Sequence, residues 1–160
     1  MREQTSETIA ILQHTDDLVL RSGPSTLEIR FADTPAAHSV LQQLAFSSTV
    51  SALSLRILHI RGYHVFPLID VYLNAKNAPF DERLQVGSMA LYGLRGSSTA
   101  DSKNPGTGLH ESWDVTRVFE IAARQKNWSY HSFTLTFVPQ HAFPEGAELS
   151  FERIELVVFN

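Results

Sequence analysis

The sequence contains no cysteine, which excludes a disulfide framework, a thiolate metal site and a cysteine nucleophile. Basic residues are also few: Lys and Arg number 13 against 17 Asp and Glu, a formal charge of −4. Since no cluster of Lys and Arg could follow a phosphate backbone, we expect no nucleic-acid partner.

Long apolar runs are absent as well. The longest are interrupted by Arg56, His59 or Asp70 and fall short of the ~18 residues needed to cross a bilayer, so we expect no membrane association. Residues 1–7 are polar and acidic, unlike the basic and then apolar start of a signal peptide. The sequence as it stands favours a cytoplasmic location.

Common catalytic motifs are missing too. The chain has no GxSxG elbow, no phosphate-binding loop and no HExxH helix, and its carboxylates are dispersed over segments that we expect to be turns. Nothing assembles a nucleophile, a base and an orienting group. We therefore expect the chain not to be an enzyme on its own.

Apolar residues that recur at every second position, or in short runs bounded by turn residues, predict a chain of strands. Strands 53–60 and 67–73 follow one another closely, which favours antiparallel neighbours, and Gly87 in strand 84–91 indicates a bulge or a close backbone approach. The predicted strands are 26–31, 53–60, 67–73, 84–91, 131–138 and 149–159.

Two short helices are predicted in the connections. Thr34 and Pro35 are typical of an N-cap and a first helical position, and open a helix that ends near residue 46. Asp114 precedes a second helix, which ends near residue 127, and is placed to cap its first amides. The composition of residues 95–108 predicts a long, mobile surface loop.

Strands with short helices in the connections predict a mainly β fold, an antiparallel β-sandwich of the jelly-roll kind. At 160 residues the chain suits one core. We divide it into residues 1–50, an N-terminal arm or linker with a strand and a short helix packed on the sandwich, and residues 51–160, the sandwich itself.

Several blocks within the second segment occur in a recognisable order. They are FPLIDVYLN at 66–74, Gly87-Ser88, WDVT at 113–116, TLTFVP at 134–139 and a closing strand at 154–158. Together they resemble the C-terminal β-domain of the tyrosinase and polyphenol oxidase (catechol oxidase) family, over about residues 53–160.

The resemblance implies a noncatalytic domain that covers the dicopper active site of a tyrosinase-type enzyme and assists its maturation. Its partner would be the copper catalytic domain, in the same or a separate chain, and that domain would carry the two copper ions. The oxidase site needs six imidazoles, mostly from helices, whereas no two of the seven histidines here are spaced i, i+3 or i+4. This chain is therefore expected to bind no cofactor itself.

In that family the domain inserts one bulky side chain where the phenolic substrate would lie. The candidates for this placeholder are aromatic residues on predicted loops or strand ends, while Trp113 and Trp128 are better explained as core anchors. The candidates are Tyr63, Phe66, Phe80, Tyr92 and Phe143.

Two other functions remain open. His59 and His64 flank a predicted turn and are candidates to hold Cu(II), which would make the chain a copper carrier for such an enzyme. Exposed Tyr or Trp faces on the sandwich would instead suit a small-molecule or carbohydrate-binding module.

Overall fold

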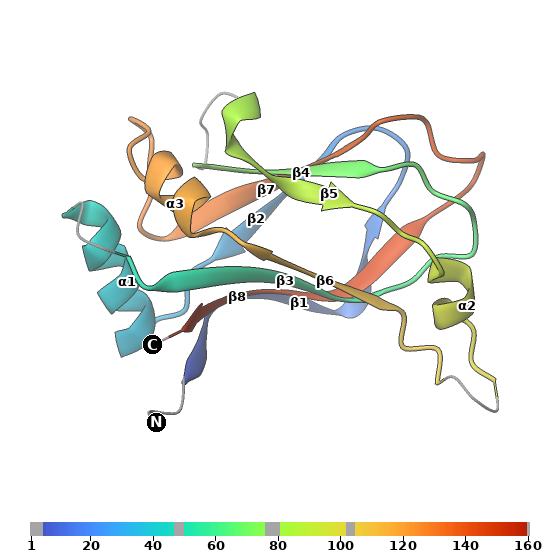
Figure 1. Cartoon of the computed structure of the whole chain (residues 1–160), viewed down its shortest axis with the longest axis horizontal. Helices are drawn as coiled ribbons and strands as arrows, with labels where there is room; N and C mark the ends of the chain where they lie inside the picture. Colours follow the sequence, from blue (N-terminus) through green and yellow to red (C-terminus); the bar gives the residue numbers. More distant parts are fainter. Residues whose placement is uncertain (1–4, 47–49, 76–80, 102–104, 160) are drawn as a thin grey trace.

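The computed structural model describes residues 5–46, 50–75, 81–101 and 105–159, and only the backbone of residues 13–17. In these parts of the chain, eight strands form two four-stranded sheets that pack face to face (Figure 1). The first sheet has the order β1-β8-β3-β6 and the second β2-β7-β4-β5. The strands are β1 Ser6–Leu20, β2 Ser25–Arg30, β3 Ala52–Ile60, β4 Ile69–Ala75, β5 Gln85–Met89, β6 Leu109–Asp114, β7 Ser132–Pro139 and β8 Leu149–Phe159.

All the strand pairs are antiparallel, and their pattern is that of one long hairpin wrapped around a core. β1 pairs with β8, β2 with β7, β3 with β6, and β4 with β5. Two additional pairs, β3 with β8 and β4 with β7, close each sheet. Eight strands in two sheets with this order form a jelly roll, so the predicted mainly β, antiparallel sandwich is confirmed.

The core lies between the two sheets and follows the alternation of apolar residues along the strands. Leu53, Leu55 and Ile57 of β3 are at most 1% exposed, as are Val71 and Leu73 of β4. Burying each such side chain stabilises the fold by roughly 1.5–3 kcal/mol. Period-two spacing therefore identifies the inward face of these strands correctly.

Two expectations about strand pairing need revision. The neighbouring pair predicted for 53–60 and 67–73 is wrong: β3 and β4 belong to different sheets, and the segment between them crosses from one sheet to the other. In addition, β1 and β2 are each hydrogen-bonded into a sheet, so the segment expected to be an arm contributes one strand to each layer. Alternation reports which face of a strand is buried, but it does not report the partner strand.

Three α-helices and one 3₁₀ turn lie in the connections of the described chain: α1 Pro35–Ala45, α2 Leu94–Ser98, α3 Thr116–Ala122 and η1 Glu82–Leu84. The predicted cap of α1 is confirmed, since Thr34 Oγ1 accepts the N–H of Ala37 at 3.2 Å. The second predicted helix ends at Ala122, earlier than expected. The loop predicted at 95–108 contains α2, and its residues 102–104 lie outside the described chain.

The helices mark two ends of the sandwich. α1 and α3 lie at one end, together with the start of β1 and the end of β8, and α2 lies at the other (Figure 1). Among the described residues, none of these helices has the length and apolar character needed to cross a bilayer. We refer below to the α1 end and the α2 end.

Candidate functional site

Exposed apolar side chains gather at the α2 end. Tyr63 is 59% exposed, Val65 88% and Leu68 42%, all in the connection between β3 and β4, and Tyr92, between β5 and α2, is 88% exposed. We call these four residues the apolar rim. Two of them, Tyr63 and Tyr92, were predicted as candidate shielding residues, and the other two were not.

A groove of about 330 Å³ runs through the rim. Hydrogen bonds to α2 hold one side of it in place: Ser98 Oγ accepts the N–H of Gly62 at 3.0 Å, and Tyr63 Oη donates to the Ser98 carbonyl at 3.2 Å. The groove is therefore built on an ordered helix. Its lining consists of His64, Val65, Phe66, Leu68, Ala90, Leu91, Tyr92, Gly93, Leu94 and Arg95.

Phe66, which is half-buried and lines the groove, and Phe143, which lies behind it, were also predicted as candidates. Phe143 is only 6% exposed, and its ring meets that of Phe66 edge to face with 4.9 Å between centroids. The backbone N–H of Phe143 donates to Ser22 Oγ at 3.1 Å. These contacts make the pair a packed support for the rim, while Phe80 lies outside the described residues.

The two histidines proposed as a copper pair have different ring partners. The rings of His64 and Phe66 meet edge to face with 6.3 Å between centroids, whereas the ring of His59 lies 4.9 Å from that of His110, also between centroids. Among the described residues, no group of three or more His, Asp or Glu side chains comes together as a metal site. His110 was not singled out from the sequence because the strand that carries it, β6, was not predicted.

Asp114, predicted as a helix cap, lies one residue before Val115, the N-cap of α3. Its Oδ1 accepts the backbone N–H of Thr116 at 3.0 Å and the Thr116 hydroxyl at 2.8 Å. These two hydrogen bonds, the backbone one first, lower the pKa of the Asp114 carboxyl. Thr116 Oγ1 in turn accepts the N–H of Leu53 at 2.9 Å, so the arrangement ties the helix start to β3.

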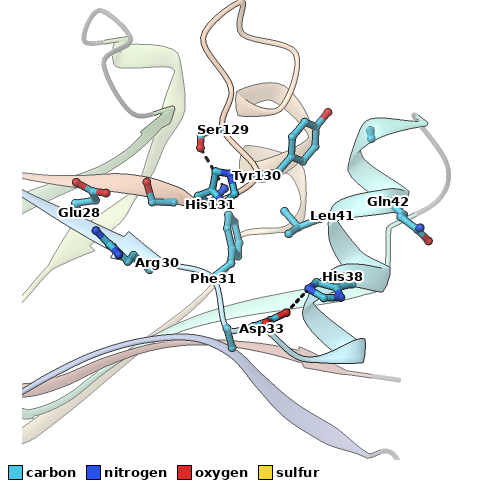
Figure 2. A pocket seen from close by; sticks show the side chains of 13 residues that line it. Glu28, Arg30, Phe31, Asp33, His38, Leu41, Gln42, Ser129, Tyr130 and His131 are labelled. Atoms are coloured by element: carbon cyan, nitrogen blue, oxygen red, sulfur yellow. Dashed lines mark hydrogen bonds and ion pairs between the residues drawn. The ribbon is translucent and has the colours of Figure 1, made fainter.

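A second concavity, of about 990 Å³, lies at the α1 end (Figure 2). Phe31 and Leu41 form its apolar part, and an Asp33–His38 pair at 2.8 Å lies on its border. Tyr130, 49% exposed, lies across the concavity from His38. The remaining lining is mainly polar: Glu28, Arg30, Ala32, Gln42, Ala45, Ser129, His131 and Ser132.

Phe31 connects this concavity to an aromatic cluster in the core. Its ring lies 5.3 Å from Phe133, 6.3 Å from Phe119 and 6.2 Å from Trp128, between centroids. Trp113 also packs against the core, at the β5–β6 side. Both tryptophans thus contact the core, as was expected of them.

Comparison with known proteins adds a family and several relatives. A family model described as "Domain of unknown function (DUF7868)" matches residues 6–158. Tyrosinase HcTyr1 of Hahella sp. (strain CCB-MM4) is 25% identical over 103 residues, which cover 64% of this chain and 22% of that protein.

Two solved structures match this chain at low sequence identity. Recombinantly expressed latent aurone synthase (polyphenol oxidase) has a TM-score of 0.50 at 14% identity, over 91% of this chain and 28% of that one. Latent aurone synthase (polyphenol oxidase) from natural source gives 0.47 at 14% identity, over 86% and 25%. The chain thus spans less than a third of the length of these relatives. The predicted resemblance to a domain of the tyrosinase and polyphenol oxidase family is confirmed.

Proposed function

Because this chain belongs to the family described as Domain of unknown function (DUF7868), a description that states no activity, we propose its function from its exposed surface and its relatives. The proposal is that the chain is a noncatalytic domain that covers the dicopper active site of a tyrosinase-type catalytic domain. The observation that carries it is the apolar rim at the α2 end.

The rim has the character of a protein-binding surface. Eight large apolar side chains are exposed among the described residues, and four of them form the rim. Contiguous apolar surface of this kind is costly to leave in water and marks interaction sites, and Tyr is enriched at the centre of interfaces. The packed pair Phe66 and Phe143 next to the rim supports a preformed contact surface.

Tyr92 is the residue that we assign as the placeholder. Its side chain is a phenol, the functional group on which tyrosinases act, and at 88% it is more exposed than Tyr63 at 59%. Tyr63 is held back by its hydrogen bond to the Ser98 carbonyl. A phenol ring inserted into a substrate pocket would block that pocket by occupying the substrate position.

The test is a graft onto a known relative. The segment of Tyrosinase HcTyr1 that this chain matches would be replaced by the full chain, and catechol turnover measured before and after a protease cut at the junction. We expect low turnover in the intact chimera and recovery after the cut. Equal turnover in both states would refute the shielding role, provided that circular dichroism shows the grafted domain folded.

The concavity at the α1 end supports a second candidate function, the binding of a small polar ring such as a sugar. Tyr130 is an exposed aromatic residue, and carboxylate, guanidinium and amide groups line the same concavity. Stacking on an aromatic ring together with several hydrogen bonds is the chemistry that such ligands require. A glycan array probed with the purified chain would test this, and binding lost in Tyr130→Ala would favour it over the shielding role.

A further inference from the structure

His59 lies in an unusual backbone conformation. Its φ of 57° is the only positive φ of a non-glycine residue among those described. The left-handed region costs such a residue roughly 1–2 kcal/mol. Strain of this kind persists only where the surroundings impose it, and it is concentrated at functional sites.

A β-bulge explains how the strain arises and what it achieves. The β3–β6 register shifts between Ile57 and Ile60, and both isoleucines are fully buried although they are three positions apart. The bulge therefore shifts the alternation of buried and exposed residues along β3 by one position, so that His59 does not lie on the face of β3 that packs against the core. On β6 the exposed side of the strand carries His110, so the bulge brings the two imidazoles together, with 4.9 Å between their centroids.

The tautomer of the neutral His59 ring follows from its hydrogen bond. Nδ1 lies 3.0 Å from the carbonyl oxygen of Thr107, and because a carbonyl can only accept, Nδ1 carries the hydrogen. The Nε2 lone pair is left available. In metal sites, a histidine ligand commonly donates the N–H of its other ring nitrogen to a backbone carbonyl, and this hydrogen bond orients the ring.

The segment that supplies this carbonyl is itself held in place. Gly108 has a φ of 85°, and a Cβ there would collide with the backbone of Ile60, so only glycine allows the segment to run this close to β3. The Gly108 N–H donates to the Ser97 carbonyl at 2.9 Å, and Arg61 Nε donates to the Gly106 carbonyl at 3.0 Å. Thr107 is thus anchored on both sides.

We propose that His59 and His110 form a two-imidazole site for a divalent late transition metal, with Cu(II) preferred. Two imidazoles whose nitrogens lie about 2.1 Å from one ion have centroids roughly 4.5 Å apart at the right angle of tetragonal Cu(II) and roughly 5 Å apart at a near-tetrahedral angle. The 4.9 Å between the centroids of this pair falls within that range. Cu(II) is preferred because imidazole suits it and because it binds most tightly among the divalent first-row metals.

The site differs from the pair expected from the sequence, since His110 takes the place of His64. His110 is exposed, so water can complete the coordination of a bound ion. The site is also at the α2 end, where β3 and β6 approach α2 (Figure 1). The inference stands on the geometry of the pair and does not depend on the shielding role.

The test is Cu(II) titration of the full chain by calorimetry, with electron paramagnetic resonance of the complex. The variants are His59→Asn, chosen because Asn tolerates a left-handed φ, His110→Gln, and the double variant. His64→Gln is the matched control. Thermal melts would establish that each variant is folded.

We expect one Cu(II) per chain, with nitrogen couplings from two imidazoles. Each single variant should weaken binding by at least about tenfold, the double variant should abolish this site, and the control should not change it. A wild-type chain that binds no Cu(II), or one whose binding persists in the folded double variant, would overturn the proposal. Tighter binding of Zn(II) than of Cu(II) in a parallel titration would overturn the stated metal preference.

Discussion

The indole ring of Trp113 on β6 lies directly over Gly87 on β5, and a Cβ atom on Gly87 would come within 2.7 Å of Trp113 Cδ1. Each of these strands is at the edge of its sheet. The contact therefore joins the open edges of the two layers, and the close approach predicted for Gly87 is confirmed. The β4–β5 register also shifts beside it, between Val71 and Tyr72.

Gly87→Ala should destabilise the chain by about 1–3 kcal/mol, because the added methyl overpacks against the indole. Urea denaturation would measure the change. Gly96→Ala is the matched control, since nothing lies within 4 Å of a Cβ there, and in α2 it should be neutral or mildly stabilising. In a Trp113→Leu background, Gly87→Ala should lower the free energy of unfolding by less than it does in wild type. An equal loss in both backgrounds would show that contact with the indole does not cause the destabilisation.

Tyr92→Ser should relieve inhibition in the tyrosinase chimera. If the ring is the anchor of the interface, its loss costs at least about 2 kcal/mol, or roughly 30-fold in the occupancy of the closed state. The measurement is catechol turnover of the uncut chimera. Tyr130→Ser, at the α1 end, is the control and should leave turnover low. Equal turnover in the two variants would remove Tyr92 from the placeholder role.

Glu111→Gln should stabilise the chain at neutral pH. Burial raises the pKa of the Glu111 carboxyl, opposed by a hydrogen bond from the Ala90 N–H. For an acid with a raised pKa in the folded state, stability is greatest below the unfolded pKa and falls as pH rises through the folded value. The amide can still accept from Ala90 and carries no charge to desolvate.

The measurement is urea denaturation of Glu111→Gln and wild type at pH 7 and near pH 4. The variant should be the more stable at pH 7, and its stability advantage over wild type should shrink as pH falls toward the unfolded pKa of a Glu carboxyl, about 4.3. Glu145→Gln, an exposed position, should show no such trend. A Gln variant that is less stable at pH 7 would contradict the prediction.

Asp114→Ala should destabilise the chain by about 1 kcal/mol at neutral pH, because the start of α3 loses its acceptor. Asp114→Asn keeps an acceptor oxygen and should lose less. The lowered pKa of Asp114 means that its contribution is present above the unfolded pKa and disappears as pH falls through the folded value. Thermal melts from pH 7 to 3 should show that the difference in melting temperature between wild type and Asp114→Ala becomes smaller. A difference that stays constant would assign the loss of stability to packing.

Local signals predicted the elements that carry strong patterns. The Thr34–Pro35 start of α1 and the strands at 53–60 and 149–159 have signals in residues close in sequence, and these expectations were confirmed. β6 was missed because its residues Leu109–Asp114 are mostly polar and lie between a loop of turn residues and a helix. α2 was missed because Gly and Ser dominate its composition, which is typical of a loop.

The candidate site was only partly predictable for a related reason. Tyr63 and Tyr92 were selected as aromatics on loops, but Val65 and Leu68 are apolar residues that a pattern assigns to a core as readily as to a surface. Phe143, selected by the same argument, is buried. The exposure of a loop residue depends on how the loop lies over the sheets, and this is not encoded in its neighbours along the chain.

The order of apolar and polar residues alone determined that this chain forms strands with one buried face, because the two-residue repeat of a strand is a local property. Only the tertiary structure decided which strands pair, since that depends on contacts between distant segments. The long-hairpin wrapping places β3 beside β6, and the bulge in β3 turns His59 toward His110. The rim and the histidine pair therefore exist only once the two sheets have closed over their common core.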